Sequence, residues 1–529
     1  MRVSTFSQIQ YIHKLIEEQA LKNPDKVAIE FKNESLSYQG LNEQSNRLAH
    51  YLIGIGVTSE TKVGICVCRS LDMIVAILAV LKAGGAYVPI DPDYPVHRIE
   101  YIFLDSEIQI LLMQESIKTK LPTNTKVKKI CLDSERPIYL SFPETNPTSF
   151  IGTDSMAYLL YTSGSTGNPK GVMITHKNLI ASYFSWHNIY QLTSRDRHLQ
   201  MASFSFDVFS GDLFRALCSG ASLVICPKES LLRPDRLYSL LKSKEITCAE
   251  FVPAILRRLY NYMLDHKKSL RFLRLLLCGS DTWSLGEYRA LKQLCGLNTR
   301  IINSYGLTEA TIDSTWFEET NNTTNELSQA HYVPIGKPFP HVDIYLLDDK
   351  SQLVPSGNIG EIYIGGLGVG RGYYNKPDLT EERFITLKIR NELKRLYKTG
   401  DLGKMLPDGN IQFLERTDNQ IKLHGIRVEL SEIEHAINSY SKIKENAVVL
   451  DDYNPEHPRL IAFIVPSEKT EELSIKLRHY LNDHLPHHLI PSMFSEIESM
   501  PVTPNNKIDR GMLKQLCVNL HTHLPSETD

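Results

Sequence analysis

Short apolar runs rich in β-branched residues alternate with longer helical patterns over the first two-thirds of the chain. The run KVGICVC (62–68) predicts a buried strand, LDMIVAILAVLK (71–82) predicts a helix, and AYVPI (86–90) predicts the next strand. Strand, helix and strand in this order are typical of a parallel sheet with crossover helices. The pattern therefore predicts an α/β fold for this part of the chain.

Further apolar runs end where small or polar residues begin, and four of them predict strands of the same kind: MAYLLY (156–161), EITCAEFV (245–252), LRLLLC (273–278) and RIINSY (300–305). In open α/β sheets, ligands bind outside the carboxyl ends of the strands. We therefore expect the segments that follow these runs to supply functional residues.

The pattern changes between residues 333 and 416, where short strands such as GEIYIGG (360–366) are separated by Gly and Pro turns. Such spacing predicts an antiparallel β subdomain. The segments 115–150 and NNTTN (321–325) are expected to be surface loops.

A compact segment with its own secondary structure follows Arg416. SEIEHAINSY (431–440) predicts a helix and RLIAFIVP (459–466) predicts a strand. We therefore expect two domains. Residues 1–417 form a large N-terminal body of mixed α/β sheets plus the antiparallel subdomain, and residues 418–529 form a smaller, mobile α+β lid.

The composition excludes several classes of function. Of the 529 residues, 42% are hydrophobic and 22% charged, as in globular proteins. Lys and Arg number 58 against 61 Asp and Glu, a net charge of −3, so no global positive field exists to hold nucleic acid or an anionic membrane. The longest apolar stretch, Met73 to Leu81, is too short to cross a bilayer, and no signal sequence is visible, so a cytoplasmic location is expected.

The nine cysteines are dispersed and form no CxxC pair. This indicates reduced thiols rather than a disulfide framework. The histidines show no HExxH or similar spacing, so a structural zinc site is not expected.

The most specific motif is the Gly-rich loop TSGSTGNPKG (162–171), which directly follows the strand ending at Tyr161. Its glycines let the backbone approach an anion, its hydroxyls can donate to phosphate oxygens, and Lys170 supplies positive charge. It differs from the GxxxxGK[ST] pattern because Gly171 follows the lysine. We interpret it as a phosphate-binding loop rather than a flexible surface turn.

This loop resembles the phosphate loop of the adenylate-forming superfamily, which includes acyl-CoA synthetases, luciferases and the adenylation domains of nonribosomal peptide synthetases. Ten segments in order, this loop among them, are similar to core motifs of the amino-acid adenylation branch. The other nine are LSYQGLN (36–42), LKAGGAYVPIDPDYP (81–95), SFDVFSGDLF (205–214), NSYGLTEAT (303–311), GEIYIGGLGVGRGYY (360–374), YKTGDLGK (397–404), LERTDNQIKLHGIRVELSEIE (414–434), LPHHLIPSMF (485–494) and NNKIDR (505–510).

The resemblance implies that a carboxylate condenses with ATP to give an acyl-adenylate and pyrophosphate, a reaction that depends on positioning and electrostatics. It implies ATP and Mg²⁺ as cofactors, with Glu309 as the metal ligand. The implied catalytic residues are Lys507, Glu309, Thr308 and Lys170. The implied nucleotide-binding residues are Thr162, Ser163, Gly164, Ser165, Thr166, Gly167, Asn303, Tyr305, Gly306, Asp401 and Arg416.

By the same resemblance, Asp401 accepts both ribose hydroxyls, the Tyr305 ring packs on adenine, and Lys507 bridges the carboxylate and the α-phosphate. Asp418 is implied to be the hinge of the lid. Three positions depart from the usual pattern: Glu415 replaces a glycine, His424 replaces an arginine, and Asn506 replaces a glycine.

The resemblance also gives the positions that line the amino-acid pocket: Asp207, Val208, Gly211, Glu250, Leu276, Cys278, Ser304, Ile312, Asp313 and Lys507. Asp207 is similar to the acid that pairs with an α-ammonium group. Glu250 and Asp313 would be unfavourable in a mostly apolar pocket unless a cation pairs with them. We therefore predict a basic amino acid as the substrate.

Val208 and Gly211 would leave room for a side chain, and Leu276 and Ile312 would line its methylene groups. This combination resembles pockets that select ornithine, so ornithine is favoured, followed by lysine, arginine or another diamino acid. The alternative is that Glu250 pairs with a protein cation such as Arg257 or Lys242, and that the substrate is neutral.

Three other functions compete with this prediction. The first is adenylation of a small neutral amino acid such as D-alanine, and the second is an acyl- or aryl-CoA ligase, which Asp207 disfavours. The third is a binding or scaffold protein that has lost catalysis, which the presence of Lys170, Glu309, Asp401 and Lys507 disfavours.

An aminoacyl-adenylate of this family is normally transferred to a thiol. We therefore expect a carrier protein, acting in trans, to supply phosphopantetheine. A stand-alone adenylation protein, or else an excised domain, is expected, because no carrier segment is visible after Lys507. We also expect a monomer.

Overall fold

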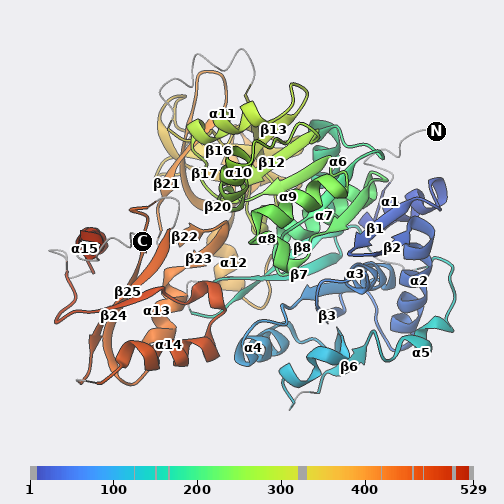
Figure 1. Ribbon diagram of the computed structural model, residues 1–529, viewed down its shortest axis with the longest axis horizontal. Coiled ribbons are helices and arrows are strands. Elements are labelled where there is room, and N and C mark those ends of the chain that lie inside the picture. Colours follow the sequence, from blue (N-terminus) through green and yellow to red (C-terminus); the bar gives the residue numbers. More distant parts are fainter. Residues whose placement is uncertain are drawn as a thin grey trace. The chain divides into compact units, whose positions relative to one another are not determined.

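The structure is a computed structural model that describes residues 9–123, 126–148, 152–164, 167–319, 331–418, 420–454, 458–468, 470–502 and 508–522. It divides into two compact units, drawn in Figure 1. The first unit comprises Met1–Pro92, Phe103–Tyr161 and Gly171–Thr417, and the second comprises Asp93–Ile102, Thr162–Lys170 and Asp418–Asp529. The C-terminal segment thus begins a separate unit at Asp418, and this unit also takes in the Gly-rich loop.

The first unit contains a nine-stranded sheet with a parallel centre and antiparallel edges. The strands lie in the order β15 (Lys337–Pro338), β14 (Thr315–Glu318), β13 (Arg300–Tyr305), β12 (Leu275–Gly279), β11 (Cys248–Phe251), β9 (Arg197–Gln200), β10 (Ser222–Ile225), β1 (Val27–Phe31) and β2 (Glu34–Ser37). The six strands from β13 to β1 run parallel, so their carboxyl ends meet at one edge.

A second, seven-stranded sheet lies in the same unit. Its order is β18 (Gly372–Tyr373), β8 (Lys170–Thr175), β7 (Met156–Thr162), β4 (Ala86–Pro89), β3 (Lys62–Cys66), β5 (Ile110–Met113) and β6 (Lys128–Cys131). Strands β7, β4, β3, β5 and β6 pair in parallel. The Gly-rich loop connects β7 to β8.

The third sheet is antiparallel and has five strands. β16 (Val342–Leu347), β17 (Ile359–Gly366), β20 (Glu392–Met405) and β19 (Phe384–Ile389) are neighbours in this order, and β21 (Ile411–Arg416) also pairs with β20. This sheet corresponds to the subdomain expected between residues 333 and 416.

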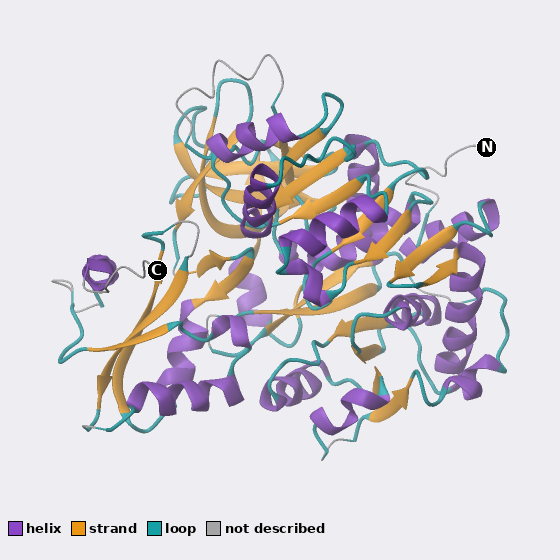
Figure 2. Ribbon diagram, in the orientation of Figure 1, coloured by secondary structure: helices purple, strands orange, loops and turns teal. Residues whose placement is uncertain are grey.

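Helices cover the sheets of the first unit, as Figure 2 shows. They are α1 (Ile12–Lys22), α2 (Tyr38–Gly54), α3 (Leu71–Ala83), α4 (Val96–Ser106), α5 (Arg136–Leu140), α6 (His176–Tyr190), α7 (Asp207–Cys218), α8 (Lys228–Leu231), α9 (Pro234–Ser243), α10 (Pro253–Asp265), α11 (Leu285–Leu294) and α12 (Pro377–Arg383). Of these, α4 begins within the second unit. Short 3₁₀ turns lie at η2 (Glu115–Lys120) and η3 (Thr308–Ala310).

The main core of the first unit is a single cluster that includes strands of both large sheets and helices α3, α6 and α7. Helix α3 is apolar apart from Asp72 and Lys82, and all of its residues except Asp72 are buried. A helix that is hydrophobic all round needs partners on every side, which explains its place in the middle of this core. A second cluster packs α9, α10 and α11 against the other face of the nine-stranded sheet.

The second unit has a small α+β fold. β22 (Gln420–Leu423) and β23 (Ile426–Glu429) form a hairpin, and β24 (Ile443–Asp451), β25 (Arg459–Pro466) and β26 (Met493–Glu496) form a three-stranded sheet. Helices α13 (Leu430–Asn438), α14 (Leu473–His484) and α15 (Arg510–Thr522) and the 3₁₀ turn η5 (His487–Leu489) complete the described part. Alternate residues of β24 and β25 enter two separate apolar clusters, one on each face of the sheet.

The predicted fold class, mixed α/β with an antiparallel subdomain and a smaller α+β part, is confirmed. The expectation of a loop over 115–150 is wrong in part, because β6 adds a parallel edge strand at Lys128–Cys131. Only two of its four residues are fully buried, which leaves a weak hydrophobic pattern. The segment 321–325 lies outside the described residues.

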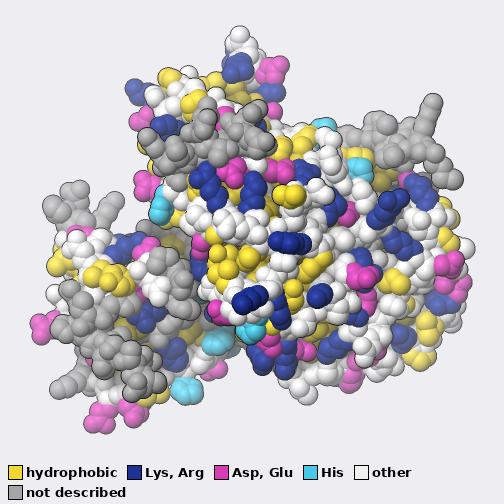
Figure 3. Space-filling view, turned by 45° about the horizontal axis from the view of Figure 1, so that its top comes forward, with side chains coloured by type: hydrophobic (Ala, Val, Ile, Leu, Met, Phe, Trp, Pro, Cys, Tyr) yellow, Lys and Arg dark blue, Asp and Glu magenta, His cyan; other side chains and the backbone are white. Residues whose placement is uncertain are grey.

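Among the described residues, no helix combines the length and the apolar character that crossing a lipid bilayer requires. Figure 3 shows basic and acidic side chains interspersed with uncharged ones over the face in view. The nine cysteines all lie within the described residues and form no disulfide, and Cys68 alone of them is exposed.

Candidate functional site

The predicted pocket residues gather at the carboxyl edge of the nine-stranded sheet. Helix α7 begins there at Asp207, after β9, and Glu250 lies near the end of β11. Ser304 lies near the end of β13, and the loop that follows β13 carries Ile312 and Asp313. The parallel register of β9, β11, β12 and β13 brings these segments, distant in sequence, to one edge.

The two faces of the sheet separate the predicted residues. Glu250 is in register with Leu277, a member of the core cluster that contains α6 and α7. Leu276 and Cys278 belong to the other cluster, under α9, α10 and α11. Because side chains alternate along a strand, the structure does not bring Leu276 and Cys278 together with Glu250. The expected methylene-lining role of Leu276 therefore lacks support here.

A tight and strained loop places Asp313. A side chain at Gly306 would meet the backbone oxygen of Ile312 at 1.8 Å, so glycine allows the loop to fold back on the end of β13. Thr311 and Ile312 both have positive φ, 61° and 75°. This conformation is costly for β-branched residues and is found where surrounding structure imposes it, often at functional sites. The strain favours a functional role for the residues of this loop.

Three buried carboxylates surround one guanidinium, that of Arg215 on α7. Arg215 Nη2 is 3.2 Å from Asp212 Oδ1 and makes a short ion pair with Glu250 Oε2, and Arg215 Nη1 is 3.7 Å from Asp313 Oδ2. Side-chain exposure is 1% for Arg215 and 5% for each acid. We call these four residues the acid cluster.

Arg215 also fills the space beside Gly211, which was expected to hold a substrate side chain. A Cβ atom at Gly211 would lie 2.9 Å from Arg215 Nη2 and 3.5 Å from Ile312 Cγ2. The guanidinium carbon lies 5.1 Å from the Trp186 ring centre and 6.0 Å from that of Tyr190. The Arg215 guanidinium therefore occupies the space beside Gly211. The expectation that this space is open to a substrate side chain is corrected.

If all three acids were ionised, the charges of the acid cluster would not balance, since one guanidinium would face three carboxylates. Burial, followed by the negative charge of Glu250, raises the pKa of Asp313 to about 7. Burial likewise raises the pKa of Asp212 well above its usual range. His198 on β9 adds no positive charge, because burial lowers its pKa far below neutrality. The cluster can thus accommodate a further cation.

The alternative for Glu250 is right in part, because a protein cation does pair with this acid. The cation is Arg215, whereas Arg257 pairs with Glu287 and Lys242 is exposed on α9. Arg215 does not fully neutralise Asp212 and Asp313. A cationic ligand would therefore pair with Asp313, because Glu250 already has a cation.

The first turn of α7 holds the predicted anchor for an α-ammonium group. Asp207 is half-buried, and its Oδ1 accepts a hydrogen bond from the Val208 N–H at 2.8 Å. Burial raises the pKa of Asp207 to about 6, and a hydrogen bond from Thr308 opposes this shift. An ammonium group beside it would favour the ionised form.

The predicted nucleotide-contacting residues of the first unit form a hydrogen-bonded group. Tyr305 donates through its hydroxyl to Asp401 Oδ2 at 2.5 Å, and Arg416 makes a short ion pair with Asp401 Oδ1. Asn303 donates through Nδ2 to the Pro334 oxygen at 2.9 Å, while its buried Oδ1 has no hydrogen-bond partner among the described residues. The structure thus brings Tyr305, Asp401 and Arg416 together.

Glu309 is fully buried in the 3₁₀ turn η3. Its Oε1 accepts a hydrogen bond from the Tyr373 hydroxyl at 2.8 Å, and its backbone oxygen accepts one from Gly370 at 2.8 Å. Thr308, the preceding residue, is half-buried. Backbone and side-chain bonds therefore hold the carboxylate in one position.

The Gly-rich loop needs its glycines for steric reasons. A side chain at Gly164 would meet the Asn168 oxygen at 1.9 Å, and Gly167 has φ of 85°. Within the second unit, Ser163 donates through its hydroxyl to the Arg427 oxygen at 3.0 Å. The Thr162 hydroxyl is buried without a hydrogen-bond partner among the described residues, and Lys170 is buried. Ser165 and Thr166 lie outside the described residues.

Two predicted residues concern the second unit. Asp418, the proposed hinge, is its first residue after Thr417, and the carboxylate accepts a hydrogen bond from the Gln420 N–H at 3.3 Å. Lys507, the proposed catalytic lysine, lies outside the described residues.

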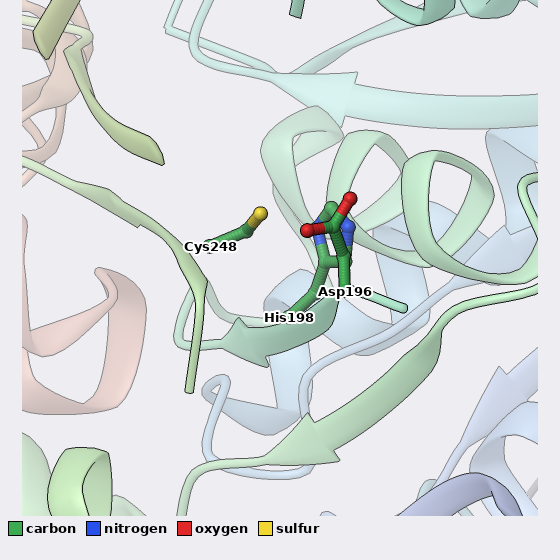
Figure 4. A group of neighbouring side chains, drawn as sticks. All are labelled: Asp196, His198 and Cys248. Carbon is green, nitrogen blue, oxygen red and sulfur yellow. The ribbon is translucent and has the colours of Figure 1, made fainter. Parts of the chain in front are cut away.

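A separate group of potential metal ligands lies at the opposite end of β9 and β11. Oxygen, nitrogen and sulfur atoms of Asp196, His198 and Cys248 approach within 4.8 Å of one another, and Figure 4 shows the three side chains. Arg274 donates to both oxygens of Asp196, at 2.9 Å each, and its Nη2 lies 3.4 Å from the Cys248 sulfur. A guanidinium therefore already provides the positive charge for this group.

Sequence reasoning missed Arg215 and Tyr373. A signal for Arg215 was present, because it is the one basic residue in DVFSGDLFRALC and lies four positions after Gly211, on the same helical face. Tyr373, at the edge strand β18, carries no comparable signal. Only the fold brings it to Glu309.

The fold is α/β with predicted pocket residues at the carboxyl ends of parallel strands, and a separate α+β unit is present. The chain belongs to the AMP-binding enzyme family: residues 16–374 match the AMP-binding enzyme domain, and residues 432–507 match the AMP-binding enzyme C-terminal domain. The predicted resemblance to the adenylate-forming superfamily is thereby confirmed.

Curated relatives are large synthases. Gramicidin S synthase 2 of Brevibacillus brevis is 42% identical over 516 residues, which are 97% of this chain and 11% of the relative. Bacitracin synthase 2 of Bacillus licheniformis is 42% identical over 503 residues, 95% of this chain and 19% of the relative. The chain thus spans between a tenth and a fifth of the length of these two relatives.

Solved structures share the fold. An artificially fused adenylation–PCP di-domain NRPS from Klebsiella oxytoca is 26% identical with a TM-score of 0.81, and the match covers 92% of this chain and 93% of that one. An o-succinylbenzoate CoA synthetase from Bacillus subtilis has a TM-score of 0.82 at 22% identity, covering 94% and 97% of the two chains. The second likeness concerns the fold alone.

Proposed function

We propose that this chain uses ATP to activate an amino acid with a basic side chain, ornithine in the first place and then lysine or another diamino acid. A carboxylate oxygen of the amino acid attacks the α-phosphorus of ATP, pyrophosphate leaves, and aminoacyl-AMP forms. Membership of the AMP-binding enzyme family and the similarity to a solved adenylation–PCP protein support this chemistry.

The observation that carries the substrate proposal is the unbalanced charge of the acid cluster. Three buried carboxylates face a single guanidinium, and the second oxygen of Asp313 has no hydrogen-bond partner among the described residues. Leaving such groups unpaired costs several kcal/mol, roughly 3–5 for a broken buried pair. A cationic substrate side chain would offset that cost.

The nucleotide side of the proposal rests on Asp401, Tyr305 and Asn303. The unpartnered Asn303 Oδ1 is suited to accept a hydrogen bond from the amino group of adenine. Asp401 could accept both ribose hydroxyls with its two oxygens, in exchange for the bonds from Tyr305 and Arg416. Lys170 and the Gly-rich loop are proposed to bind phosphate oxygens of ATP. For the first unit, Gly306 is proposed as a nucleotide-binding residue and Thr308 as a phosphate contact.

Glu309 is the proposed Mg²⁺ ligand. Mg²⁺ in proteins takes one or two carboxylates and completes its shell with water and phosphate oxygens. The buried carboxylate of Glu309 fits this donor set. When bound, the ion would neutralise charge on the phosphate oxygens, while Tyr373 holds the carboxylate in place.

The proposed acceptor of the aminoacyl group is the phosphopantetheine thiol of a carrier protein, acting in trans. The thiol sulfur attacks the acyl carbon of aminoacyl-AMP, and AMP leaves. The solved relative that joins an adenylation domain to a PCP domain supports a partner of this kind.

A small neutral amino acid such as D-alanine is a second candidate substrate, and one observation favours it. Arg215 pairs with Glu250 and occupies the space beside Gly211. A shortened pocket with a neutralised glutamate would suit a small side chain.

Amino-acid-dependent ATP–pyrophosphate exchange tests the proposal. We expect exchange with ornithine to exceed that with any neutral standard amino acid, because no neutral side chain compensates Asp313, and to exceed that with lysine or arginine to a smaller extent. Highest exchange with alanine in either configuration would support the second candidate and contradict the first. No exchange with any amino acid, together with AMP formation from a fatty or aryl acid and coenzyme A, would overturn both.

A further inference from the structure

Helix α7 presents three residues toward the proposed substrate at successive turns. Asp207, Gly211 and Arg215 follow one another at intervals of four residues, so they lie on one helical face. With a rise of 1.5 Å per residue, Gly211 is about 6 Å along the helix axis from Asp207. The helix therefore forms one wall, with the proposed ammonium anchor at its N-terminal end.

The Arg215 side chain bends back toward the level of Gly211. Its Nη2 atom would be only 2.9 Å from a Cβ at that position, and the next neighbour is Ile312. The aromatic rings of Trp186 and Tyr190 lie beyond the guanidinium, at 5.1 and 6.0 Å. Packing between α6, α7 and the strained loop thus holds the Arg215 guanidinium over the face of α7 at the level of Gly211.

The partners of Arg215 are unequal. Nη2 is in contact with both Asp212 and Glu250, whereas Nη1 remains 3.7 Å from Asp313 and makes no hydrogen bond. Asp313 Oδ2 is buried and likewise makes none. The guanidinium is therefore committed mainly to Asp212 and Glu250. Asp212 Oδ2 is also buried without a hydrogen-bond partner among the described residues, but Asp212 lies closer to the guanidinium, so Asp313 is the acid with the most capacity left for a ligand.

We infer that Arg215 is a specificity-determining residue of this pocket. Its guanidinium closes the far end, holds Glu250 in an ion pair, and leaves Asp313 to receive the terminal cation of a short substrate side chain. This inference rests on the proposed adenylation of a basic amino acid and adds a limit on the length of that side chain.

The length limit follows from simple distances. An extended chain advances about 1.2 Å per bond, so the terminal nitrogen of ornithine, four bonds from Cα, reaches about 5 Å. That of lysine reaches about 6 Å, and the guanidinium of arginine extends further. A substrate anchored at Asp207 has about 6 Å before the level of Gly211, where the guanidinium of Arg215 would repel a longer cation. Ornithine or a shorter diamino acid therefore fits, lysine just reaches the limit, and arginine exceeds it.

Replacing Arg215 tests the inference through substrate selectivity. In Arg215→Ala, a substrate guanidinium can take the position beside Glu250 and Asp212 that the protein's own guanidinium held. We expect kcat/KM for arginine to rise at least about tenfold relative to that for ornithine, measured by ATP–pyrophosphate exchange; one misfitting methylene alone is worth about 10- to 200-fold.

Removing the only cation of the cluster can also impair folding, so a second variant that keeps the net charge of the cluster unchanged is needed. Arg215→Ala with Glu250→Gln removes one charge of each sign and still opens the pocket. We expect kcat/KM for lysine to rise at least about tenfold relative to ornithine in this variant. Arg257→Ala, which removes an arginine paired with Glu287 outside the cluster, is the matched control and should leave the selectivity unchanged.

The outcomes separate this inference from the function on which it rests. If the unaltered protein activates ornithine, and the ornithine, lysine and arginine ratios stay within about threefold in both Arg215 variants, the length limit is overturned and the proposed function stands. If the unaltered protein activates no basic amino acid, the proposed substrate class fails and the inference fails with it. A gain of lysine or arginine activity in the Arg215 variants alone supports both.

Discussion

The double variant Asp313→Asn with Glu250→Gln is expected to lower kcat/KM for ornithine by about 10²–10³-fold, because a buried ion pair with the substrate is lost. The effect on a neutral amino acid should be small, since a neutral side chain makes no such pair. The measurement is ATP–pyrophosphate exchange at several concentrations of ornithine and of norvaline, which has the same carbon chain without the terminal amine.

The variant should still fold, because Asp212 remains to pair with Arg215 and the cluster becomes neutral. A matched control is Glu287→Gln, which removes a carboxylate of the same body that pairs with Arg257 outside the pocket. Thermal unfolding of the variants separates lost selectivity from lost structure. Equal losses for ornithine and norvaline would remove the case for a cationic substrate.

Replacing Lys507 with alanine is expected to reduce the rate of adenylation by about 10²–10³-fold. The resemblance places this lysine between the carboxylate and the α-phosphate, where its charge matters most as negative charge develops. A cation that acts mainly in the transition state lowers kcat more than it raises KM. Single-turnover formation of aminoacyl-AMP at saturating ATP and ornithine measures this step directly.

Lys444→Ala is a suitable control, since Lys444 is an exposed lysine of the same unit whose ion-pair partner is its neighbour, Glu445. The control should keep the rate within about twofold, as is usual for surface substitutions. Retention of the full rate in Lys507→Ala would assign the catalytic cation to another residue.

The sequence predicted the architecture well where its pattern was strong. Continuous apolar runs such as MAYLLY became buried parallel strands, and the apolar segment LDMIVAILAVLK became helix α3, which is buried except at Asp72. The prediction from sequence failed at the edge strand β6. Its two buried residues give too weak an alternation of hydrophobic and polar positions to distinguish a strand from a loop.

Within the candidate site, position in the motifs located Glu250, Asp313, Tyr305 and Asp401, and the fold brings them together in two groups. Motif positions could not give the direction of each side chain. Leu276 lies on the face of the sheet opposite to that of Glu250, because neighbouring residues of a strand point to opposite faces. They also could not show that Arg215 bends back over Gly211, because that contact depends on packing between three elements.

The central claim is that a buried, under-neutralised acid selects a cationic side chain for adenylation. The most direct measurement is the ratio of kcat/KM for ornithine to that for norvaline in ATP–pyrophosphate exchange by the unaltered protein. The two substrates differ only in the terminal ammonium group that Asp313 is proposed to receive. We predict a ratio above about 100, which corresponds to about 3 kcal/mol. A ratio near or below one would contradict the account.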